Sequence, residues 1–129
     1  MTQLLLDTHI FIWYSTDDPK LGSALSNHLE DSDNALFLSI ASLWEIAIKL
    51  NIGKLNLGCP FPELCIFCTD ADITILPIAQ ADLEFYLGLP LHHRDPFDRL
   101  IISQAITRSL TVVSRDAMFA AYSVDRLWL

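Results

Sequence analysis

The sequence predicts a three-layer α/β fold, with helices on both faces of a central, mostly parallel sheet of four to five strands. Short apolar runs alternate with longer segments of helical periodicity along the chain, and this alternation is typical of a parallel sheet. Turn signals of Gly, Pro and Asp separate the segments. A length of 129 residues favours one domain, residues 1–129.

The first elements are predicted from periodicity and turn residues. An apolar run at 4–6 indicates a strand, and helical spacing over 9–14 follows it directly. A turn signal at 16–19 then precedes a short helix over 23–29. These elements form the first strand–helix unit of the sheet.

The middle of the chain repeats this order. After a strand at 35–38, Ser39 is a suitable N-cap for a helix that runs to Asn51, and Gly53 provides its stop. The later elements follow the same logic, and Asp95 with Pro96 marks the start of the clearest helix. The remaining expected elements are helices over 60–69, 79–87, 95–108 and 116–122, and strands at 73–76, 110–113 and, as an edge strand, 126–128.

Composition restricts the function. The net charge is −8, which counts against a passive nucleic-acid-binding module, since phosphate contacts need Lys and Arg. It counts less against a nuclease that binds cations, and it suits a basic partner. An uninterrupted apolar stretch long enough to span a membrane is not found, and the start resembles no secretory signal, so we expect a cytoplasmic protein without a membrane partner.

The three cysteines fit a reducing compartment better than a disulfide framework. Cys65 and Cys68 have the spacing of a metal-binding pair. A zinc site needs a second ligand pair, for which His92 and His93 are poor candidates, so buried apolar cysteines are favoured.

Four acidic residues are embedded in apolar or structured segments: Asp7, Glu45, Asp98 and Asp116. In a parallel sheet the ligand site lies beyond the carboxyl ends of the strands, and all four acids are expected near that edge. Buried carboxylates that converge repel one another unless a cation compensates them. Because oxygen ligands suit Mg²⁺ or Mn²⁺, a divalent metal site is the first hypothesis.

Each acid also has a structural explanation. Asp7 and Asp116 fit as helix N-caps, and Asp98 can act with the N-cap Asp95. Glu45 precedes Lys49 by four residues, which is the spacing of an exposed ion pair. The joint placement at one edge is what favours a site.

Four motifs in order carry a family resemblance: Leu4-Leu5-Leu6-Asp7-Thr8-His9, Ser39-x-x-Ser42-x-x-Glu45, Asp95-Pro96-Phe97-Asp98-Arg99, and Ser114-Arg115-Asp116. With them the chain resembles PIN-domain proteins, specifically the VapC-like toxins of type II toxin–antitoxin pairs. The resemblance implies a Mg²⁺- or Mn²⁺-dependent endoribonuclease that acts on RNA, a homodimer, and a small VapB-like antitoxin that blocks the site. It assigns the catalytic and metal-binding roles to the four acids.

Neighbouring residues complete the predicted site. We expect supporting roles for Thr8, Ser42, Asp95 and Ser114, and candidate RNA contacts at Lys49, Arg99 and Arg115. For Arg99 an ion pair is favoured over a phosphate contact. His9, His92 and His93 are expected mainly on the surface or in structural roles, with the rim of the site as the alternative.

Two other classes of protein remain open. A phosphoryl-receiver or dehalogenase-like domain also places acids at strand ends, but it needs an acidic pair after the first strand, and here the order is Asp7-Thr8-His9. The second alternative is a PIN-like binding module without catalysis. The complete set of four acids argues against it.

Overall fold

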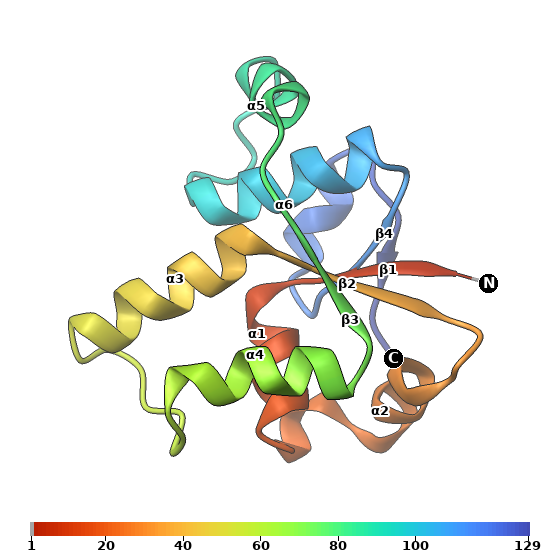
Figure 1. The fold of residues 1–129 in the computed structure, drawn as a ribbon. Helices are drawn as coiled ribbons and strands as arrows, with labels where there is room; N and C mark the ends of the chain where they lie inside the picture. The colour runs from red at the N-terminus through yellow and green to blue at the C-terminus, as the bar shows by residue number, and fades with distance from the viewer. Residues whose placement is uncertain (1) are drawn as a thin grey trace.

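The computed structural model describes residues 2–129 and contains a five-stranded sheet. All neighbouring strands are parallel, and the order across the sheet is β3-β2-β1-β4-β5 (Figure 1). This confirms the predicted α/β class, and the edge strand near the C-terminus is present. The strands are β1 (Gln3–Leu6), β2 (Ala35–Ser39), β3 (Ile73–Leu76), β4 (Thr111–Val113) and β5 (Arg126–Leu127).

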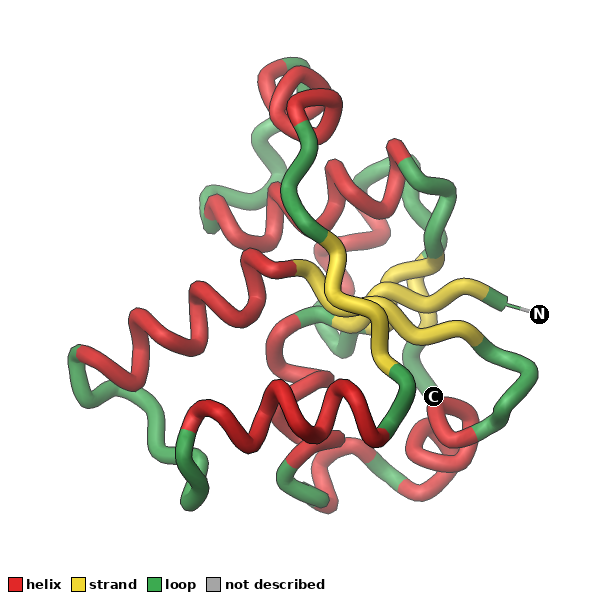
Figure 2. The backbone as a smooth tube through the Cα atoms, in the orientation of Figure 1, coloured by secondary structure: helices red, strands yellow, loops and turns green. Residues whose placement is uncertain are grey.

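Helices cover both faces of the sheet, as Figure 2 shows by colour. The α-helices are α1 (Thr8–Ser15), α2 (Ser23–Glu30), α3 (Ile40–Asn51), α4 (Phe61–Asp70), α5 (Gln80–Leu87) and α6 (Pro96–Thr107). Two 3₁₀ helices complete the set, η1 (Pro19–Leu21) and η2 (Ala117–Ala121). The first was expected only as part of a turn, and the second is the short helix that was predicted over 116–122, formed as a 3₁₀ helix.

The hydrophobic core has two parts, one on each face of the sheet. Leu4 and Leu6 of β1 point to the face that is covered by α1, α2, α3 and α4, whereas Leu5 points to the face that is covered by α6 and η2. Alternate residues of a strand face opposite sides, so a continuous Leu run is what a strand buried on both faces requires. The predicted three layers are therefore present.

Polar caps start the helices at the places that the sequence indicated. The side chains of Asp7, Ser39, Asp95 and Asp116 each accept a hydrogen bond from a backbone N–H in the first turn of α1, α3, α6 and η2. These bonds satisfy amide groups that have no partner within the helix. The caps also bring three of these four residues to the carboxyl ends of β1, β2 and β4.

Strand register brings the residues after β1 and β4 together. Leu6 pairs with Val113 in the ladder, and the amide of Asp7 donates to the Val113 carbonyl at 3.0 Å. Asp7 and Ser114, which are far apart in sequence, are therefore neighbours in space. This is the sheet edge at which a ligand site is expected.

Helix α3 has an unusual distribution of polarity. Its polar residues Ser42 and Glu45 are buried, at 0% and 5% exposure. Its outer face carries exposed apolar side chains at a spacing of four residues: Ile40, Trp44, Ile48 and, at the C-cap, Ile52. The outward face of α3 is therefore apolar and its inward face is partly polar.

Two further expectations concern the whole chain. Within residues 2–129 no helix is both long enough and apolar enough to cross a membrane. The three cysteines are free thiols, with Cys68 buried, Cys59 half-buried and Cys65 exposed. The expectation of buried cysteines is correct for Cys68 and wrong for Cys65.

Candidate active site

Asp7 is buried at the junction of β1 and α1. One carboxylate oxygen accepts from the Ile10 amide at 2.8 Å, and the other accepts from the Ser114 hydroxyl. Burial raises the pKa of Asp7 against the opposing effect of these two hydrogen bonds, and the nearby Asp116 raises it further. Asp7 is thus an N-cap, as its position suggested, and also a carboxylate that would gain from a cation.

Glu45 enters the same region from α3. Its Oε1 accepts from the Thr8 hydroxyl at 2.8 Å, and Oε2 pairs with Lys49 Nζ at 2.8 Å. Ser42 Oγ is 3.0 Å from Thr8 Oγ1. The predicted ion pair exists, but Glu45 is buried, so the polar stripe of α3 forms an inner wall and not a solvent face.

Asp98 lies in the first turn of α6, after the N-cap Asp95. Asp95 is exposed and accepts from the amides of Phe97 and Asp98, which confirms its role as a cap. Burial raises the pKa of Asp98 to about 7, with further increases from Asp95, Asp7 and Glu45 and an opposing effect of His93. Carboxylates that belong to other elements of the fold therefore contribute to the raised pKa of Asp98.

Asp116 and Ser114 complete the group from the segment after β4. Ser114 Oγ, besides donating to Asp7, accepts from the Asp116 amide at 3.0 Å, and so links two of the acids. Burial tends to raise the pKa of Asp116, but the Met118 amide and His93 outweigh it and lower the pKa overall. The Asp116 side chain is 44% exposed, so it faces the open side of the site.

His93 is the site residue whose importance the sequence did not reveal. Its ring is buried, stacks on Tyr122 at 5.5 Å between centroids, and places Nε2 3.1 Å from Asp116 Oδ2. One ligand atom from each of His93, Asp98 and Asp116 lies within 4.8 Å of the others. The one feature of the sequence that could have indicated this role is the position of His93 just before Asp95, the N-cap of α6, at the same edge of the sheet.

The surroundings of His93 favour one tautomer. Nδ1 is buried and has no hydrogen-bond partner among residues 2–129. A proton on Nδ1 would be an unsatisfied donor, whereas a proton on Nε2 is donated to Asp116. The ring of His93 therefore orients the Asp116 carboxylate through Nε2. A histidine that ligates a metal usually has a partner for its second nitrogen, which favours the carboxylates as ligands.

The acids converge on a pocket of about 290 Å³. Its walls are Asp7, Asp98 and Asp116 together with His9, Trp13, Arg115 and Phe119. Glu45 lies behind this wall and reaches the site through Thr8. Carboxylate oxygens are the donors that Mg²⁺ and Mn²⁺ prefer. Burial, and to a smaller extent neighbouring acids, raise the pKa of Asp7 and of Asp98, and a bound cation would offset this cost of ionisation. The residues fit a divalent cation.

The two arginines of the predicted site lie in different environments. Arg99 is buried, and its guanidinium donates to the carbonyls of Pro90, His93, Tyr86 and Leu89. This burial corrects the prediction of an RNA contact, and carbonyl oxygens replace the ion-pair partner that was expected. Arg115 lines the acidic pocket with its guanidinium 6.0 Å from the Trp128 ring centroid, so it remains accessible to a ligand.

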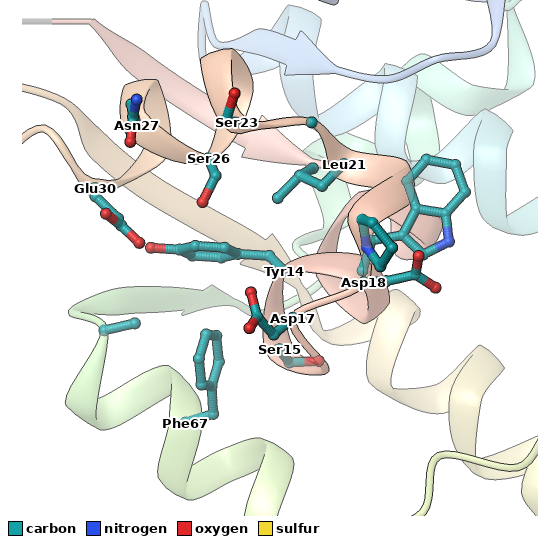
Figure 3. Close-up of a pocket in the computed structure, with 14 residues that line it drawn as sticks. Tyr14, Ser15, Asp17, Asp18, Leu21, Ser23, Ser26, Asn27, Glu30 and Phe67 are labelled. Carbon is teal, nitrogen blue, oxygen red and sulfur yellow. The ribbon is translucent and has the colours of Figure 1, made fainter.

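A larger hollow of about 730 Å³ lies elsewhere, between α1, η1, α2 and α4. Aromatic rings and acids line it, and the Tyr14 hydroxyl points toward the Glu30 carboxylate (Figure 3). Trp13 contributes to this hollow and to the acidic pocket, so the two adjoin. None of the four candidate acids lines the larger hollow among the described residues.

Comparisons with known proteins agree with this arrangement. The family model of the PIN domain matches residues 4–125. Ribonuclease VapC22 of Mycobacterium tuberculosis (strain ATCC 25618 / H37Rv) is 30% identical over 131 residues, which cover 98% of this chain and 96% of that protein.

Solved structures show the same fold at lower identity. A chain of VapBC2 from Rickettsia felis, bound to a promoter DNA fragment, gives a TM-score of 0.71 at 18% identity and covers 99% of this chain and 100% of that one. A chain of VapBC-5 from Mycobacterium tuberculosis gives 0.67 at 20% identity, with 100% of both chains covered. From the family match, the VapC relative and the fold together, this chain belongs to the PIN-domain family and is VapC-like within it.

Proposed function

We propose that the protein is a Mg²⁺- or Mn²⁺-dependent endoribonuclease and the toxin of a VapBC-type pair, acting in the cytoplasm as one domain of residues 1–129. The observation that carries this proposal is the convergence of Asp7, Asp98 and Asp116 on one pocket, with Glu45 behind it. The capping roles of Asp7 and Asp116 do not explain why Asp98 and Glu45 lie close to them, since Asp7 and Glu45 raise the cost of ionising Asp98. A relative that is named a ribonuclease supports the same function.

Each residue of the candidate site has a separate role in the proposed reaction. Asp7, Asp98 and Asp116 would hold the cation, and Glu45, whose oxygens are engaged by Thr8 and Lys49, would complete the site directly or through water. Ser114 and His93 fix the orientations of Asp7 and Asp116. When bound, the ion supplies a more acidic water and neutralises charge on the scissile phosphate. Hydrolysis in line would leave a 5′-phosphate and a 3′-hydroxyl.

Cleavage of cellular RNA by the purified protein tests this function. We expect wild type to cut in Mg²⁺ or Mn²⁺ and not in EDTA, and Asp7→Asn and Asp98→Asn to lose cutting. Asparagine can still cap at position 7, so folding should persist and circular dichroism should match wild type. Asp33→Asn, which removes a charge from an exposed turn, is the matched control and should cut normally.

Three results would count against the proposal. They are cleavage that is independent of metal, cleavage that survives both substitutions, and folded wild type that binds metal but cuts no RNA. The last result would favour a PIN-like binding module. The termini of the products provide an additional check.

We also propose a basic antitoxin as partner. Solved relatives include VapBC complexes, and the net charge of −8 favours a basic segment at the acidic pocket. The hollow in Figure 3, with Trp13, Tyr14 and Phe67 in its walls, is a suitable groove for a helix of that partner. Its position beside the pocket would allow one chain to occupy both.

A homodimer is the third part of the proposal. The apolar stripe on α3 is exposed, with Trp44 at 59% and Ile52 at 56%. Trp44 also packs edge-on against Phe97 of α6 at 5.3 Å between ring centroids. A second copy of the chain would remove this surface from water, which is the usual reason for such a patch.

A further inference from the structure

Every lysine of the chain lines one hollow beside the acidic pocket. The sequence contains three lysines, Lys20, Lys49 and Lys54, in a chain of net charge −8. All three line a hollow of about 500 Å³ between α1, η1 and the loop after α3. A concentration of positive charge in so acidic a protein requires an explanation.

The local structure brings the lysines together from separate elements. Lys20 lies in η1, where Asp18 caps its amide at 2.9 Å. Lys49 is in the last turn of α3, and Gly53, with φ of +73°, turns the chain so that the Lys54 amide donates to the Lys49 carbonyl at 2.8 Å. Only glycine adopts this conformation without strain, so the turn that places Lys54 beside Lys49 depends on it.

Two of these lysines have no anionic partner. Lys49 pairs with Glu45, but neither Lys20 nor Lys54 forms a salt bridge within residues 2–129. Both are exposed. By contrast, Arg99 and Arg126 donate to backbone carbonyls, and Arg108 pairs with the buried Asp82. Lys20 and Lys54 are therefore cations that are available to a ligand.

The lysine hollow and the acidic pocket share a wall. His9 and Trp13 line both of them and lie one turn apart on α1, with ring centroids 6.1 Å apart. Trp13 also packs edge-on against Trp128, with centroids 6.4 Å apart. Aromatic rings between a basic and a catalytic region are typical of proteins that bind single-stranded nucleic acid, because bases stack on them while phosphates meet cations.

We propose that the lysine hollow binds the phosphate backbone of single-stranded RNA that continues from the acidic pocket, with His9 and Trp13 contacting a base between the two regions. This inference rests on the proposed ribonuclease function and adds the path of the substrate. RNA is the favoured occupant because a protein of net charge −8 repels a polyanion, so that binding depends on its few available cations, among which are Lys20 and Lys54. A strand that enters the pocket must also cross the shared wall.

Lys20→Ala combined with Lys54→Ala tests the path without exposing an unpaired acid. Lys49 is left intact because its removal would leave Glu45 without a partner. Gln3→Glu with Gln80→Glu is the matched control, since it changes net charge equally at exposed positions that line neither this hollow, the acidic pocket nor the hollow of Figure 3. Lys20→Arg with Lys54→Arg keeps both charges.

Two measurements are made on each variant: metal-dependent cleavage, and binding of a labelled single-stranded RNA in EDTA at several salt concentrations. For the Lys→Ala pair we expect KM to rise several-fold while kcat is largely retained. The slope of log K against log salt should become shallower by about 0.7 for each lost phosphate contact. The control and the Lys→Arg pair should resemble wild type.

The outcomes separate this proposal from the ribonuclease function. If wild type cuts and the Lys→Ala pair equals the control, the path is overturned and the nuclease stands. If wild type fails to cut yet binds RNA through the two lysines, the nuclease fails and the binding site stands. If wild type neither cuts nor binds RNA, both proposals are overturned.

Discussion

The protonation of Asp98 depends on the carboxylates around it. Burial of the side chain is the main reason why its pKa is raised from an ordinary value of 3.8 to about 7 in the folded chain. Between these two pH values the folded state binds more protons than the unfolded state. The free energy of unfolding contributed by Asp98 therefore falls as pH rises from about 4 to about 7.

Asp98→Asn should accordingly stabilise the metal-free protein at high pH. In EDTA at pH 8 we expect its unfolding temperature to exceed that of wild type by several degrees, because a destabilising charge has been removed. The difference should shrink as the pH falls from about 7 to about 4, because below about pH 4 Asp98 is protonated in both the folded and the unfolded chain. Thermal unfolding followed by circular dichroism measures this. A variant that is less stable than wild type at pH 8 would contradict the origin assigned to this pKa shift.

The sequence indicated the four acids as candidates, but not the distant side chains with which they form hydrogen bonds. Asp7 shows why, since its N-cap bond is local and was expected, whereas its bond to Ser114 joins residues that only the sheet brings together. The residue type of His93 did not indicate a role in the site, because an isolated histidine is more often structural. Its proximity to Asp98 and Asp116 depends on the fold of the loop before α6.

At the scale of elements, Arg99 connects α6 to the loop that follows α5. Its guanidinium donates to four carbonyls, and it lies 4.8 Å from the Tyr86 ring centroid. The motif suggested an ionic or phosphate contact because arginine is common in both. The burial that decides between these roles comes from packing, which periodicity does not report.

Arg99→Met should destabilise the protein by about 2–4 kcal/mol, because buried carbonyls lose their donor. Arg115→Met is the control, since Arg115 is exposed, and it should change stability by less than about 1 kcal/mol. Urea denaturation of both variants measures the difference. Equal, small effects would show that Arg99 does not hold this loop in place.

At the scale of the molecule, the parallel sheet explains why sequence reasoning predicted that these acids lie at one edge. Parallel strands end at one edge, so residues after β1 and β4 had to meet once the strands were identified. Strand order and the continuity of the pocket with the lysine hollow were not predictable. Both depend on long-range packing, and the lysines come from η1 and a loop that carried only turn signals.

The apolar stripe on α3 predicts that the protein is a dimer in solution. Trp44→Glu should convert a dimer into a monomer, because it places a charge in the centre of the proposed interface. Ile66→Glu on α4 is the control, as Ile66 is similarly exposed at 58% but lies on another helix. Sedimentation or light scattering gives the mass. A wild-type monomer, or a dimer that survives Trp44→Glu, would refute this interface.

Calorimetric titration of Mn²⁺ into the metal-free protein at pH 8 tests the central claim most directly. If the acids form one cation site, wild type and Asp33→Asn bind Mn²⁺ with equal affinity, and Asp7→Asn and Asp98→Asn lose that binding while staying folded. Wild type that binds no Mn²⁺, or Asp98→Asn that binds it as tightly as wild type, would show that these carboxylates do not form a metal centre.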